Sequence, residues 1–351
     1  MTWDVALILI SDGLANGAVY LLAGLGLVLI FSVTRVVFVP FGDVAAFAAL
    51  SLAAFETGHT PPTIGLVLTL AILAVLVELW GLARRRDYAR MPRAVVLWGV
   101  LPALPCLAAW TIAGHSMPAV VNIVVSIALV VPITPLIARI ALQPIADASV
   151  LVLLIASLAL HYLLSGLGLL FFGAEGSRTS PLATGAVTLG NGISISAQTL
   201  LMIASAIVLS GLFYLLFERT LTGKALRATA VNRVGSRLVG IRPARTASLA
   251  YLGASLLAGL IGVLISPVTT MYYDSGFIIG LKAFVAAIIG GLTSYPLTAI
   301  GALAVGLVES FASFWNGGLK DVLVFSLLIP VLLLRSFMMT HVEEEEEEID
   351  Q

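Results

Sequence analysis

Long apolar segments with almost no charge recur along the whole 351-residue chain. A transmembrane helix needs about 20 predominantly apolar residues to cross the hydrocarbon core of a bilayer. Segments 5–33, 63–83 and 150–172 meet that length with at most one Asp, Glu, Lys or Arg each. Because 60% of the residues are hydrophobic and only 11% are charged, a water-soluble core is excluded. The sequence therefore predicts an all-α, polytopic transmembrane bundle.

We expect about eleven spans, some of them half-helices, in one transmembrane domain over residues 1–340. Pro40 interrupts the helical structure between the first two spans. The acidic run Glu343–Glu348 predicts a solvated, disordered tail over residues 341–351. The expected spans cover residues 5–33, 42–55, 63–83, 94–113, 119–140, 150–172, 197–217, 247–265, 277–289, 297–314 and 321–334.

Fifteen of the 18 Lys and Arg residues fall in segments that this arrangement places on one side of the membrane. Lys and Arg in short loops resist translocation, so this bias predicts that their side is the cytoplasm. The N-terminus then lies outside and the C-terminus inside. The basic residues are Arg35, the five arginines from Arg84 to Arg93, Arg139, the seven basic residues from Arg219 to Arg245, and Arg335.

Two alanine-rich segments suggest an internal repeat. Gly42–Ala49 opens a span that runs outward, and Gly280–Ala287 lies in a span that runs inward. Each follows a long helix and an irregular link. Similar composition in opposite directions is expected of an inverted repeat, although alanine-rich helices also resemble each other by chance.

The polar segment 218–246 is too polar to cross the membrane and too long for a tight turn. Lys224–Val231 mixes alanines with basic residues, which predicts a short amphipathic helix, and Gly223 and Gly240 bracket it. Such a helix, lying parallel to the membrane, could dock into a groove on a soluble partner. The residues alone equally allow a loop that only sets topology or touches anionic lipid.

Several motifs in this order resemble the LivH-type permeases of the branched-chain amino acid and amide ABC importer family. The resemblance is strong from Ala197 to Arg335 and looser before it, where residues 84–116 look like an inserted helical pair. The motifs are Glu218-Arg-Thr, Gly223-x-Ala225-x-Arg227-Ala228, Leu238-x-Gly240-Ile241, the run Gly276–Gly291, Gly306-Leu-Val-Glu-Ser310, and Lys320-Asp-Val with Leu-Leu-Leu-Arg335.

This resemblance implies a multi-pass permease subunit of a bacterial inner membrane that moves branched-chain amino acids or a related small amide or organic acid. It implies three kinds of partner: a second permease (LivM-like or a second copy), two ATPase subunits that bind ATP-Mg, and a substrate-binding protein. The coupling residues toward the ATPase would be Glu218, Arg219, Gly223, Ala225, Arg227, Asn232 and Gly240.

The chain itself is not expected to be an enzyme or to bind a cofactor, a metal or nucleic acid. A Walker A loop needs G-x-x-x-x-G-K-[ST], but Gly223-Lys224 is followed by Ala225 and lacks the upstream glycine. ATP must therefore bind to another chain if it drives transport. We find no spacing of ligating or nucleophilic residues that predicts a metal centre or a catalytic triad.

The candidate substrate pathway comprises Asn16, Tyr20, Phe41, Asp43, Lys282 and Glu309. After the first span the family carries an Asn-Phe-Ala-His-Gly-Glu-like stretch, whereas this chain has Phe38-Val-Pro-Phe-Gly-Asp43. Phenylalanines replace the Asn and His of that pattern. If those positions touch substrate, the resemblance implies a less polar cargo.

Each candidate also has a structural explanation. Asn16 and Tyr20, one turn apart, could line the pore or only bond to another helix. Asp43 could simply complement a helix dipole. A Lys at the bilayer centre costs about 2.5–3.5 kcal/mol, so Lys282 should pair with Glu309, line a cavity or reach the surface.

Two further features have the same ambiguity. His161 is a lone histidine on an apolar span, which favours hydrogen-bonded packing over a proton relay. Gly290-Gly291, ahead of Pro296, suits a tight turn or a hinge.

Two other functions compete with an importer subunit. A stand-alone secondary transporter would need coupling-ion carboxylates deep in the membrane, for which Glu309 is the candidate. A scaffolding membrane protein would not need the long polar segment 218–246.

Overall fold

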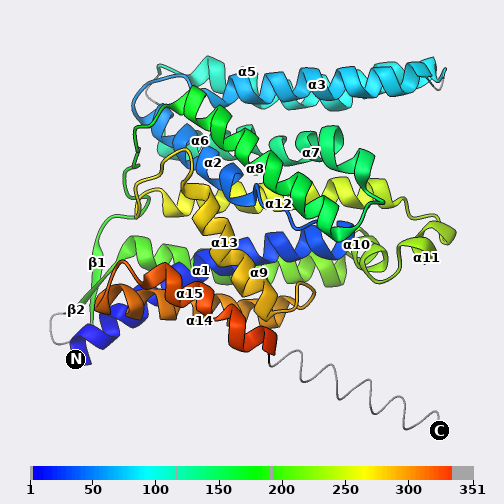
Figure 1. Ribbon diagram of the computed structural model, residues 1–351. Helices are drawn as coiled ribbons and strands as arrows, with labels where there is room; N and C mark the ends of the chain where they lie inside the picture. Colours follow the sequence, from blue (N-terminus) through cyan, green and yellow to red (C-terminus); the bar gives the residue numbers. More distant parts are fainter. Residues whose placement is uncertain (1–2, 85, 116, 190–192, 334–351) are drawn as a thin grey trace, which may run out of the picture.

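The structure is a computed structural model that describes residues 3–84, 86–115, 117–189 and 193–333 (Figure 1). Arg335 and the acidic segment 341–351 lie outside the described residues. The helices are α1 (Trp3–Thr34), α2 (Phe41–Glu56), α3 (Thr63–Arg84), η1 (Tyr88–Arg90), α4 (Met91–Val95), η2 (Val96–Val100), α5 (Leu101–Ile112), α6 (Ala119–Val130), α7 (Ile133–Ile137), η3 (Ala138–Leu142), η4 (Gln143–Ile145), α8 (Val150–Phe172), α9 (Ala197–Arg219), α10 (Leu221–Val231), α11 (Arg233–Leu238), α12 (Pro243–Ile265), α13 (Ser275–Ile289), α14 (Tyr295–Trp315) and α15 (Lys320–Ser326).

Within the described residues, eight helical stretches are long and apolar enough to cross a membrane. They are α1, α3, the stretch Tyr88–Ile112, the stretch Ala119–Ile145, α8, α9, α12 and α14. The expected spans 42–55 and 277–289 are the shorter helices α2 and α13. Of the expected span 321–334, helix α15 covers only the first half and ends at Ser326. At 1.5 Å per residue, the 16-residue α2 is about 24 Å long, less than the ~30 Å hydrocarbon core.

Helices α1 and α12 form the centre of the bundle. Helix α1 packs along α14 and α12, and α12 packs against α2 and α6. Peripheral helices expose large apolar side chains, such as Trp110 (66% exposed) on α5 and Leu170 (80% exposed) on α8. Apolar side chains on both the inside and the outside of a bundle are expected when the surrounding solvent is lipid.

Glycines allow α14 to pack closely against α1. A Cβ added to Gly306 of α14 would lie 2.3 Å from the backbone nitrogen of Gly17 on α1, and 2.4 Å from the oxygen of Gly13. Small residues spaced four apart allow such an approach of two membrane helices. Gly24 and Gly26, also on α1, make room for Thr298 and for the ring of Phe41.

The described chain is mainly helical, as predicted, but it also contains one short β-hairpin. Residues Ala186–Leu189 (β1) and Ile193–Ser196 (β2) form an antiparallel hairpin, with Val187 opposite Ile195. β-branched residues on both arms suit a pleated strand. The hairpin lies at the end of the bundle away from α10 and α11 (Figure 1).

The short helices α2 and α13 begin against each other inside the bundle. A Cβ on Gly42 would lie 1.8 Å from the Gly276 oxygen, and a Cβ on Gly276 would lie 2.2 Å from the Gly42 oxygen. Each glycine is the second residue of its helix, and each helix follows a long helix and an irregular link. This reciprocal contact fits an inverted repeat in which Gly276, and not Gly280, is the counterpart of Gly42. The repeat itself stays a prediction.

Candidate functional site

The polar segment after α9 folds into two short helices that project at one end of the bundle (Figure 1). Thr220 caps α10, because its hydroxyl oxygen accepts a hydrogen bond from the Gly223 N–H at 3.0 Å. Asn232 separates α10 from α11 and caps the second helix by accepting from the Gly235 N–H at 2.8 Å. The expected helix Lys224–Val231 is thus present, but it begins earlier, at Leu221.

Gly223 does not end a helix as the sequence suggested. It lies inside α10 and packs on the end of α9, where an added Cβ would come within 2.2 Å of the Leu216 oxygen. Gly240 does act as punctuation, since it follows α11 with a left-handed φ of 83°.

Helix α10 has one buried face and one exposed face. Gly223, Leu226 and Thr229 are buried against the bundle. Leu221 (85% exposed), Lys224 and Val231 (81% exposed) face outward, and Ala225 is half-buried beside them. An exposed stripe that combines large apolar residues with a cation is a surface suited to a groove on another protein.

An ion pair ties α10 to the end of α9. The Arg227 guanidinium donates to both carboxylate oxygens of Glu218, and the hydrogen bond raises the pKa of Arg227. Arg219, the last residue of α9, is exposed. The packing of Gly223 and this exposed ion pair therefore both connect α10 to α9.

A cavity of about 620 Å³ lies under α10, between α1, α9 and the turn before α14. Its lining is mostly apolar and aromatic, with Phe213, Phe217 and Tyr295 in mutual ring contact. Arg35 and Arg227 lie at its edge. None of the residues predicted for the substrate pathway lines this cavity.

Three predicted residues, Tyr20, Lys282 and Glu309, form a buried polar cluster, which the half-buried Asp321 borders. Lys282 Nζ on α13 donates to Glu309 Oε1 on α14 at 2.5 Å, and the Tyr20 hydroxyl on α1 donates to Glu309 Oε2 at 2.5 Å. Asp321 Oδ1 of α15 lies 2.8 Å from Lys282 Nζ, as a charge contact without hydrogen-bond alignment. The expected Lys282–Glu309 pair is confirmed, while a role in transport stays a prediction.

A second buried pair was not foreseen. His161 Nδ1 on α8 lies 2.7 Å from Asp43 Oδ2 on α2, and both residues are buried. The imidazole stacks on Phe277 of α13, with ring centroids 4.3 Å apart. The only signal in the sequence was an ionisable residue, Asp43 or His161, on each of two largely apolar helices.

The remaining candidates have simple surroundings. Phe41 is buried against Gly26, and Asn16 is half-buried on α1. Gly290 and Gly291 form the turn between α13 and α14, where Gly291 has a φ of 67°. The turn is as expected, and hinge motion there is untested.

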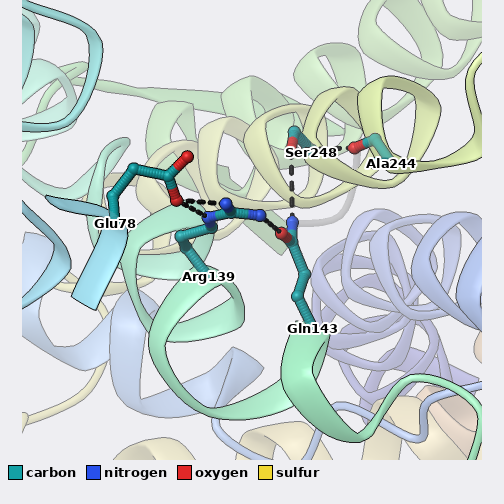
Figure 2. A network of polar contacts seen from close by, with 5 residues as sticks. All are labelled: Glu78, Arg139, Gln143, Ala244 and Ser248. Atoms are coloured by element: carbon teal, nitrogen blue, oxygen red, sulfur yellow. Dashed lines mark hydrogen bonds and ion pairs between the residues drawn. The ribbon is translucent and has the colours of Figure 1, made fainter. Parts of the chain in front are cut away.

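Figure 2 shows a polar network that connects the periphery to α12. Arg139 of η3 donates through Nε and Nη2 to Glu78 of α3, and through Nη1 to Gln143 Oε1 at 2.6 Å. The Gln143 amide donates to Ser248 of α12 at 3.4 Å. This network holds α3 in register with the start of α12.

Comparison with known proteins identifies the family. The model of the family described as "Branched-chain amino acid transport system / permease component" matches residues 9–332. The chain belongs to this permease family. It is a multi-pass membrane protein.

Individual relatives share about a third of the aligned residues with this chain. The chain is 32% identical over 208 residues to the high-affinity branched-chain amino acid transport system permease protein BraD of Pseudomonas aeruginosa, and 32% identical over 206 residues to LivH of Escherichia coli K12. Each alignment covers 56% of this chain and 66% of the relative. A probable LivH of Methanocaldococcus jannaschii is 29% identical over 228 residues, 60% of this chain and 71% of that protein. No solved structure matches the chain.

Proposed function

We propose that this chain is the membrane permease subunit of an ABC importer in a bacterial inner membrane. It forms part of the pore and hydrolyses no ATP. A second permease, either LivM-like or another copy, completes the pore. Two ATPase subunits dock on one side, and a substrate-binding protein delivers cargo on the other. The names of the relatives favour branched-chain amino acids or a similar small amide or acid as cargo.

The projecting pair α10–α11 carries this proposal. Its exposed face, with Leu221, Lys224 and Val231, has no occupant within the described chain, while Gly223 and the Glu218–Arg227 pair connect it firmly to α9. A soluble partner that pushes on this face would move a spanning helix. That linkage is the property a coupling element needs.

We infer the orientation from charge. Arg139, Arg233, Arg237 and Arg242 line one cavity near α11, and Arg35 and Arg227 line the cavity under α10, so these arginines share one end of the bundle. The excess of basic residues supports a cytoplasmic location for that end. The N-terminus and the hairpin then lie on the outer side.

Transport assays in proteoliposomes test the proposal against its main rival. The permease should move cargo only together with its ATPases, its binding protein and ATP. Uptake by this chain alone, driven by an ion gradient, would instead support a secondary transporter. The structure offers little for the latter, because the buried carboxylates Asp43 and Glu309 both already bind a basic side chain.

A further inference from the structure

A second cavity, of about 690 Å³, is lined in part by residues of α11. Helix α11 lies at the same end of the bundle as α10 (Figure 1). It shares no lining residue with the cavity under α10. Thr34 at the end of α1, the segment around η4, α11 and the start of α12 form its walls. Leu142, Ala247 and Tyr251 give it apolar surface. Its volume is within the roughly 300–1,000 Å³ of pockets that hold small organic ligands.

The charge of this cavity is not balanced by the protein. Arg139, Arg233, Arg237 and Arg242 line it against a single acid, Asp147. Of the four arginines only Arg139 has an acidic partner in the described chain, which is Glu78 (Figure 2).

The other three guanidinium groups make no ion pair or side-chain hydrogen bond with any described residue. For Arg233, the Nε atom is buried and has no acceptor. A buried donor left without an acceptor costs free energy, so an anion in the cavity would be stabilising.

The backbone adds to this positive field. Helix α12 is 23 residues long and begins at the cavity wall with Pro243. No side chain caps its first turn. The positive end of the helix dipole therefore favours an anion at the same place as the arginines.

The position of the cavity along the membrane normal favours one kind of anion. Spanning helix α1 ends at Thr34, spanning helix α12 begins at Pro243, and α8 begins at Val150, close to Asp147. The ends of spanning helices lie at the level of lipid headgroups. Basic pockets between membrane helices bind anionic headgroups, and the apolar lining suits the glycerol ester region. We propose that this cavity binds the phosphate group of an anionic phospholipid through Arg233, Arg237 and Arg242.

All the residues that line this cavity belong to this chain, so lipid binding can be tested on the purified permease without its ATPases. Wild-type protein should retain phosphatidylglycerol after detergent washing, and added phosphatidylglycerol should raise its Tm while phosphatidylcholine does not. R233Q/R237Q/R242Q should bind phosphatidylglycerol on the order of 100-fold more weakly, at roughly fivefold per arginine. The matched control R86Q/R93Q/R245Q removes the same charge from exposed arginines that do not line the cavity.

The control should bind phosphatidylglycerol like the wild type. Equal loss of binding in both triple variants would contradict the proposed site, because lipid binding would then depend only on the net charge of the protein. An equal rise in Tm with glycerol phosphate or inorganic phosphate would overturn the lipid as the source of the anion. Retention by R233Q/R237Q/R242Q at wild-type level, in a variant that remains folded by circular dichroism, would also overturn it.

Discussion

At the scale of single residues, every buried Asp, Glu, Lys or His side chain in the described part of the chain lies beside an acidic or basic partner. Lys282 is 3% exposed and Glu309 is 7% exposed, and each has a partner from another helix. Burying an unpaired charge in hydrocarbon is far more costly than burying a pair. These residues therefore hold α1, α13, α14 and α15 in one arrangement.

Replacing Lys282 with Met should leave Glu309 buried without its cation. We expect K282M to lose about 3–5 kcal/mol of stability, as other broken buried pairs do. The double variant K282M/E309Q should recover part of that loss, because no charge on α14 is then left unpaired. Thermal unfolding in detergent measures both. Equal Tm values for K282M and wild type would contradict the structural role of the pair.

The Asp43–His161 pair makes a parallel prediction for α2 and α8. His161→Phe keeps an aromatic ring beside Phe277 but removes the group that bonds Asp43. The variant should be destabilised by about 1–3 kcal/mol, because the Asp43 carboxyl group loses its hydrogen-bond partner, and D43L/H161F should be less affected than H161F. If the double variant is the worse of the two, the two residues do not act as a pair.

At the scale of elements, the meeting of α2 and α13 depends on backbone contact. An alanine at position 42 would place its Cβ 1.8 Å from the Gly276 oxygen, which only a backbone shift can relieve. Gly42→Ala should therefore lower the stability of the fold by the few kcal/mol typical of overpacking. The yield of folded protein should fall sharply as a result.

Gly211→Ala is the matched control for Gly42→Ala. Nothing lies within 4 Å of a Cβ at position 211 in α9, so this change should be neutral or should stabilise the helix by up to about 1 kcal/mol. Size-exclusion profiles and Tm values of the two variants decide the point. A well-folded G42A would show that the close approach is not required.

Local signals in the sequence predicted some of these elements and missed others. The basic, alanine-rich stretch predicted the position of α10, and the cost of burying a lysine in the membrane made a Lys282–Glu309 pair one of three expected outcomes. The partners Asp43 and His161 lie 118 residues apart, and no local pattern could bring them together. The same holds for Arg139 and Glu78, 61 residues apart, and for the packing role of Gly223.

At the scale of the whole molecule, orientation follows from the side on which the basic end lies. Cys106 is the only cysteine and is buried, so Cys106→Ala provides a background for labelling. On that background, Val187→Cys in the hairpin should react with an impermeant maleimide added to intact cells. Val231→Cys on α10 should react only after the membrane is opened. The reverse pattern would show that the protein is inserted the other way.

The exposed face of α10 is the proposed contact with the energy-supplying subunit, and cross-linking in the assembled transporter tests it most directly. A photo-reactive amino acid in place of Val231, which is 81% exposed, should cross-link to a subunit that carries a nucleotide-binding site. The same probe in place of Val187 of the hairpin should not. Cross-links from position 231 only to lipid, or none to an ATPase in a complex that is active in transport, would contradict the account.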